Sequence, residues 1–95
     1  MNLSELHTQN LPLETTKLFE ASKGKAISIA LQKNGFLKEH SSKSPAFLVC
    51  VSGETVYEDE NNSNITLKNG DYLIIEANVK HWLVGISQSN LILIT

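Results

Sequence analysis

Apolar and polar residues alternate with a period of two along much of the chain. In the segment "AISIALQ", Ile27, Ile29 and Leu31 share one face, which is the pattern of a β-strand with one buried side. The segments "AFLVCVS" and "YLII" are continuous apolar runs, which favours strands that are buried on both faces. Further strand-like runs are "TVYEDE", "NITLK", "HWLVGIS" and "NLILIT".

Turn residues separate these runs, at Gly24, Asn34-Gly35, Ser52-Gly53, residues 60–64, Asn69-Gly70 and residues 88–90. Roughly eight or nine short strands at intervals of about 8–12 residues are typical of an all-β sandwich or barrel. The first residues differ, because Leu3 and Leu6 allow one helical turn before Pro12 ends it. We therefore expect an N-terminal segment over residues 1–15, as an arm or short turn, and one β-barrel domain over residues 16–95.

Composition narrows the range of partners and compartments. All eight cationic side chains are lysines and the net charge is −2, so the arginine forks that recognise phosphates and bases are missing and nucleic acid is disfavoured. Cys50 is the single cysteine, which excludes an intrachain disulfide. No signal-peptide profile and no bilayer-length apolar run is visible. We expect a cytoplasmic protein without a membrane partner.

Glycines and histidines recur at a characteristic spacing in the second half of the chain. Gly35 precedes His40, Gly53 closes that stretch, and Gly70 opens the segment "GDYLIIEANVKH" that ends at His81. Sixteen residues, 54–69, separate the two stretches. This arrangement resembles the two motifs of the cupin family, and "LKNGDYLIIEANVKHW" is similar to a segment of small one-domain cupins. The resemblance implies a double-stranded β-helix, which is a jelly-roll barrel with an open mouth.

The motifs carry over residue by residue with several departures. His40 falls on the first histidine of motif one, one residue closer to its glycine than in the family, and Ser42 falls on the second histidine. Ala46 replaces the glutamate. In motif two His81 falls on the histidine, while the proline, second glycine and asparagine are replaced. The replacing residues are Glu76, Asn78 and Gly85.

Metal-binding cupins use both histidines and the glutamate of motif one plus the histidine of motif two. The resemblance therefore leaves only His40 and His81 as ligands, and catalytic metal centres normally have at least three protein ligands. The metals considered are Zn, Fe, Mn and Ni, held weakly or not at all. A histidine pair can also bind an anionic or hydrogen-bonding ligand, or titrate near neutral pH.

Other side chains are candidates for the cavity. Cys50 shares the face of Ala46 by the two-residue period and would supply a thiolate, although a small buried hydrophobe is the better interpretation. Ser42 and Trp82 are expected to line the same cavity as the histidines. His7 could fold over the barrel mouth, although an exposed polar residue is favoured. Glu76 is interpreted as a solvated turn carboxylate.

Three functional hypotheses follow from these residues. The leading one is a small cupin that binds a small molecule or a weakly held divalent metal in its barrel cavity. The alternatives are a metal-dependent enzyme of dioxygenase or isomerase type with non-standard ligands, and a structural or interaction module that acts through dimerisation. Cupins often pair as dimers, and exposed strand edges invite pairing, so a homodimer formed through β-edge strands is expected.

Overall fold

Nine β-strands and one 3-10 helix make up the computed structural model, which describes residues 1–95. The elements are η1 (Leu3–Glu5), β1 (Leu13–Ala21), β2 (Gly24–Leu31), β3 (Phe36–His40), β4 (Ala46–Ser52), β5 (Thr55–Asp59), β6 (Asn64–Leu67), β7 (Tyr72–Ile75), β8 (His81–Gly85) and β9 (Ser89–Ile94). The predicted all-β class is confirmed, and the helical turn expected near Leu3 is present as η1.

Two strands, β1 and β3, were not among the runs recognised in the sequence. Each lies at the edge of a sheet, and most of their side chains are exposed. An edge strand that faces water on several sides has little apolar periodicity to detect. For the same reason the start of β1 at Leu13 is not visible in the sequence pattern, from which the barrel was expected to begin at residue 16.

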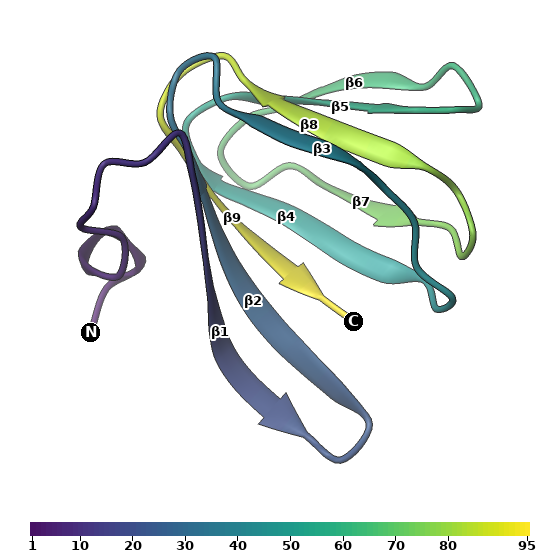
Figure 1. Cartoon of the computed structure of the whole chain (residues 1–95), viewed down its shortest axis with the longest axis horizontal. Coiled ribbons are helices and arrows are strands. Elements are labelled where there is room, and N and C mark those ends of the chain that lie inside the picture. Colours follow the sequence, from purple (N-terminus) through teal and green to yellow (C-terminus); the bar gives the residue numbers. More distant parts are fainter.

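The strands form two antiparallel sheets that face each other. The five-stranded sheet has the order β1-β2-β9-β4-β7 and the four-stranded sheet has the order β3-β8-β5-β6. Figure 1 shows the sheets joined by loops at one end and separated at the other, with the β1–β2 hairpin extending past its neighbours. This is the jelly-roll arrangement of a double-stranded β-helix. No helix has the length and apolarity needed to cross a bilayer.

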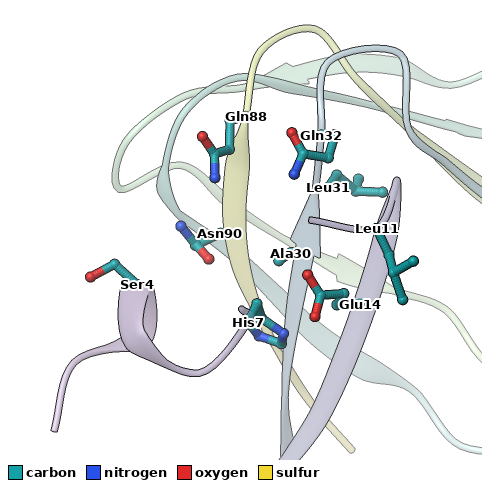
Figure 2. A pocket seen from close by; sticks show the side chains of 9 residues that line it. All are labelled: Ser4, His7, Leu11, Glu14, Ala30, Leu31, Gln32, Gln88 and Asn90. Carbon is teal, nitrogen blue, oxygen red and sulfur yellow. The ribbon is translucent and has the colours of Figure 1, made fainter. Parts of the chain in front are cut away.

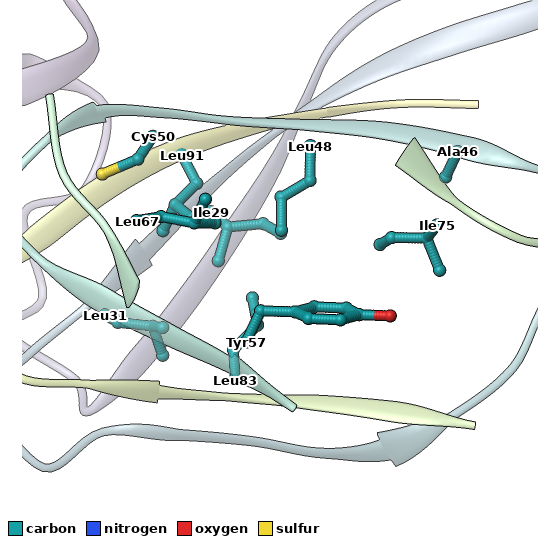
Figure 3. Close-up of a cluster of buried hydrophobic side chains, with 10 residues drawn as sticks. All are labelled: Ile29, Leu31, Ala46, Leu48, Cys50, Tyr57, Leu67, Ile75, Leu83 and Leu91. Carbon is teal, nitrogen blue, oxygen red and sulfur yellow. The ribbon is translucent and has the colours of Figure 1, made fainter. Parts of the chain in front are cut away.

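The core fills the space between the two sheets. Ile29 and Leu31 are almost fully buried, as their shared face predicted, and Leu48 and Leu91 pack near them. Figure 3 shows these side chains between the ribbons, with the ring of Tyr57 reaching across from the four-stranded sheet. The other members of the cluster are Ala46, Cys50, Leu67, Ile75 and Leu83.

Candidate functional site

His40 and His81 meet where the sheets separate. His40 ends β3 and His81 begins β8, and the antiparallel register pairs the two residues directly. Their Nε2 atoms lie 3.1 Å apart, and the ring centroids are 4.2 Å apart in an edge-on arrangement. His81 is 4% exposed while His40 is open to solvent. The pair therefore spans the boundary between the core and the barrel mouth.

The other nitrogen of each ring determines what the pair can bind. The Nδ1 atom of His81 lies 2.9 Å from the carbonyl oxygen of Val79, and that of His40 lies 3.2 Å from the carbonyl oxygen of Lys38. A carbonyl oxygen only accepts hydrogen bonds, so each Nδ1 carries a hydrogen and each neutral ring has its lone pair on Nε2. The two Nε2 lone pairs then lie close together without a hydrogen between them, and a proton or a cation bound there would remove their repulsion.

Tyr57 and Asp59 lie beside His81. The Tyr57 ring is stacked on the imidazole of His81 with centroids 6.0 Å apart. Its hydroxyl donates a hydrogen bond of 2.8 Å to Asp59 Oδ2, and Asp59 lies opposite His81 in the β5–β8 register. Backbone N–H groups of Asn61 and Ser63 donate to Asp59 Oδ1. The carboxylate is thus held in a fixed position next to the histidine pair.

Burial and these hydrogen bonds set the charges of the site. Burial lowers the pKa of His81 and the charge of His40 adds to this, while the Val79 carbonyl and Asp59 act in the opposite direction. Burial raises the pKa of Asp59, but the hydrogen bonds from Tyr57, Ser63 and Asn61 outweigh it, and the net shift is downward. Burial and the bond to Asp59 raise the pKa of Tyr57. At neutral pH a neutral His81 therefore adjoins an ionised Asp59 and a protonated Tyr57.

A groove of about 500 Å³ lies beside His40, between the β1–β2 hairpin and the loop that follows β3. Lys23 and Lys25 bring positive charge to it, and Ser42 is one of several hydroxyl groups along it. The one acidic residue of the groove, Glu20, is paired with Lys17 at 2.9 Å. The remaining lining residues are Ala21, Ser22, Gly24, Ile27, Ser44, Leu93 and Thr95. The groove is therefore polar and locally basic, although the whole chain is acidic.

The structure brings some of the predicted cavity residues together and separates others. Ser42 lines the groove next to His40, and Ala46 is buried without offering a polar atom. Trp82 was expected in the cavity, but it alternates with the buried His81 and Leu83 along β8. Since successive side chains point to opposite faces of a sheet, Trp82 lies on the outer side, and that prediction is wrong.

Cys50 does not join the histidines either. It is fully buried in the core cluster, and its thiol lies against the carbonyl oxygens of Ser52 and Gly53. Burial raises its pKa and the charge of Asp71 adds to the shift, so the thiolate that a metal requires is disfavoured. The cavity role of Cys50 is corrected, and its interpretation as a buried hydrophobe is confirmed.

His7 and Glu76 also lie apart from the pair. The Nε2 atom of His7 is 2.8 Å from Ser28 Oγ, so the N-terminal segment covers the outer side of the five-stranded sheet and not the barrel mouth. Figure 2 shows His7 in a small cavity against this sheet, with Glu14 and Asn90 nearby. Glu76 is exposed, as expected of a turn carboxylate, and lines a separate small cavity that reaches Tyr57.

Sequence reasoning missed Asp59, Lys23 and Lys25. Asp59 lies between Glu58 and Glu60, and such an acidic stretch is typical of a solvated face, although the two-residue period places Asp59 and Tyr57 on one side of β5. That period is the signal that could have identified it. The two lysines line the same groove as His40 only because the β1–β2 hairpin lies opposite the loop after β3, and no local pattern indicates this.

The donor set fits a weakly bound cation rather than a full metal centre. Two imidazole nitrogens on one tetrahedral zinc ion lie about 3.3 Å apart at bond lengths of about 2.0 Å, close to the 3.1 Å between the two Nε2 atoms. No group of three or more His, Cys, Asp or Glu side chains is arranged to hold a metal. Other coordination positions would have to be filled by water or by a small molecule.

Fold and site together define a small two-sheet β-barrel with a histidine pair at its mouth. The family profile described as "Cupin domain" matches residues 28–95. This is more than half of the chain, which therefore belongs to the cupin family. No curated protein matches it in sequence.

Solved structures agree with this fold. A cupin superfamily protein from Desulfitobacterium hafniense has a TM-score of 0.88 at 16% identity, over 98% of this chain and 84% of that chain. A conserved protein of unknown function from Streptococcus pyogenes has a TM-score of 0.84 at 17% identity, over 99% and 82%. KdgF from Halomonas sp. has a TM-score of 0.79 at 15% identity, over 87% and 76%. At these identities the likeness concerns the fold alone.

Proposed function

We propose that this cupin is a binding protein that holds a divalent metal ion weakly between His40 and His81 and a small anionic molecule in the adjoining groove. The observation that carries the proposal is the pair of Nε2 atoms 3.1 Å apart, with both Nδ1 atoms directed at backbone carbonyls. Such a pair leaves two unprotonated ring nitrogens side by side, and neutral imidazole suits Zn, Ni and Fe.

The charge of the groove supports an anionic partner. Lys23 and Lys25 line the groove with His40, while Glu20 is neutralised by Lys17. A carboxylate suits this lining, because it pairs with the lysine ammonium groups and accepts hydrogen bonds from the hydroxyl groups. A carboxylate oxygen directed at His40 would fill one of the coordination positions that this chain leaves to exogenous ligands.

Binding is preferred to metal-dependent turnover because of the donor count. Catalytic centres normally use three protein ligands and keep an open position, whereas two of the four family positions here carry Ser42 and Ala46. A two-imidazole site is expected to exchange its ion readily with solution. When bound, the ion would supply a positive charge for the ligand carboxylate.

Metal binding is tested by calorimetric titration with Zn²⁺ and Ni²⁺. His40→Ala and His81→Ala should each weaken binding at least tenfold, while His7→Ala should not, because His7 lies on the other side of the five-stranded sheet. Heat of binding that is absent in the wild type, or that is lost only in His7→Ala, would contradict the proposal.

The anion is tested separately with malonate and its neutral diamide malonamide as matched probes. Backbone chemical shifts around Ser42 and Lys25 should move with malonate and not with malonamide. The shifts should be larger after Zn²⁺ is added and smaller in Lys23→Gln/Lys25→Gln. Equal responses to the two probes would argue against an anionic ligand.

A further inference from the structure

The inner side of β2 and β9 changes from apolar to charged on the way from the core to the barrel mouth. Ile29 is paired with Leu91 in the antiparallel register, and Ile27 is paired with Leu93 one step closer to the mouth. Lys25 follows at the next step, because every second residue of a strand points to the same side. One side of this strand pair therefore runs from the closed core to a lysine.

Burial decreases along the same side. Ile29 and Leu91 are almost completely buried, and Figure 3 shows both within the core cluster. Ile27 and Leu93 are only half-buried, because they pack against this core and also line the groove beside His40. We call these two aliphatic side chains the apolar floor of the groove.

The rest of the groove carries positive charge and hydrogen-bond donors. Lys23 and Lys25 line it from the β1–β2 hairpin, and the ion pairs of the protein involve neither of them. Ser42 and Ser44 add hydroxyl groups from the loop after β3. The volume of about 500 Å³ is much larger than a bare carboxylate needs, and apolar walls with a few polar groups are typical of sites for small organic molecules.

We propose that the ligand of this groove is an alkyl monocarboxylate, whose chain lies on the apolar floor while its carboxylate pairs with Lys23 and Lys25. This inference rests on the anion site proposed above and adds the chemical class of the anion. A compact dianion would pair with the lysines but leave Ile27 and Leu93 in contact with water. An alkyl chain covers them, and each methylene group removed from water tightens binding by about threefold.

The spacing of the residue pairs sets the length of this chain. Residues on the same side of a strand are about 6.6–6.8 Å apart, so roughly this distance separates the level of Lys25 from that of Ile27. With C–C bonds of about 1.5 Å, a zigzag chain of about five carbons covers such a step. A longer chain would meet Ile29 and Leu91, which are already buried. Hexanoate is therefore the expected match.

The first test is a chain-length series on the wild type, followed by NMR titration after metal has been removed with a chelating resin. Hexanoate should bind at least tenfold more tightly than acetate, with butyrate between them, and octanoate should add less than twofold. Hexanol, which has the chain without the charge, should bind at least tenfold more weakly than hexanoate. This series needs no variant and does not depend on whether substituted chains fold.

Each other outcome of the series has its own meaning. Equal affinities for acetate and hexanoate would overturn the inference and leave the proposed anion site intact. No response to malonate or to any of the acids would overturn the anion site and the inference together. Hexanol that binds as tightly as hexanoate would show an apolar site without anion recognition, which would also overturn the inference.

The second test compares two neighbouring residues of β9. Leu93 and Ile92 are both half-buried but point to opposite sides of the sheet, so Ile92→Ala is the matched control for Leu93→Ala. Leu93→Ala should weaken hexanoate binding at least threefold with little effect on acetate, and Ile92→Ala should change neither. Lys23→Gln/Lys25→Gln should weaken both acids by the same factor. Equal losses of hexanoate affinity in Leu93→Ala and Ile92→Ala would place the chain outside the groove and overturn the inference.

Discussion

The Nε2 atoms of His40 and His81 lie 3.1 Å apart although the residues are separated by 41 positions in the chain. This contact exists because β3 and β8 are antiparallel neighbours that pair the two histidines in register. The same register places Asp59 on the other side of His81. The site is therefore built from the ends of three adjacent strands and depends on their alignment.

The stability of the protein should depend on pH through His81. Burial lowers the pKa of this residue in the folded state, whereas the unfolded chain binds a proton below about pH 6.5. The neutral ring therefore contributes stability above about pH 6.5, and that contribution is lost as pH falls through the lowered folded pKa. Urea unfolding measured between about pH 8 and pH 5 should show the loss.

His81→Gln isolates this effect, because glutamine does not titrate and other acid-sensitive groups are shared with the wild type. The unfolding free energy of the wild type minus that of the variant should decrease as pH falls. If the wild-type value minus the variant value stays constant or increases towards acid pH, the folded state does not exclude the protonated ring.

The Cys50 thiol should be unreactive in the native protein. It is fully buried, and burial with the nearby charge of Asp71 raises its pKa, so little thiolate is exposed to reagents. Ellman's reagent should label it only as fast as the protein opens, and at once in denaturant. Rapid labelling under native conditions would mean that the thiol is accessible. Since Cys50 is the single cysteine, the signal has one source.

The two glycines at the ends of the second motif should differ sharply in their tolerance of alanine. Gly70 has a φ of +87° and no atom near the position of an added Cβ, so Gly70→Ala should cost about 1 kcal/mol through backbone strain alone. At Gly85 an added Cβ would meet the backbone oxygen of Gln32, and the strands would have to move apart.

Gly85→Ala should therefore destabilise the fold by about 3 kcal/mol or more, which is the upper end of what most single substitutions cost. Thermal unfolding followed by circular dichroism compares the two variants directly. Equal losses would indicate that the β8 backbone has room to shift and that the close approach is not a constraint.

Much of the fold can be predicted from the sequence, because local patterns of residues determine it. Alternation identifies Ile29 and Leu31 as buried, and the motif spacing that resembles cupins aligns His40 with His81. Local patterns fail where most side chains of a strand are exposed, as in β1 and β3, or where a partner element is distant in the sequence. Trp82 was expected in the cavity although it alternates along β8 with the buried His81. Lys25 lines the same groove as His40 only through tertiary packing.

Thr55 offers a route to a more stable protein. Its side chain is fully buried, and its hydroxyl oxygen has no hydrogen-bond partner. An unsatisfied buried hydroxyl costs about 1–3 kcal/mol of desolvation, whereas valine has the same shape without the polar atom. Thr55→Val should therefore raise the unfolding free energy by about 1 kcal/mol, which for a chain of this size raises Tm by roughly 4–8 °C. Thr66→Val on exposed β6 is the matched control and should change Tm little. A lower Tm for Thr55→Val would reveal a buried water bound to the hydroxyl, since loss of a satisfied hydrogen bond destabilises the core.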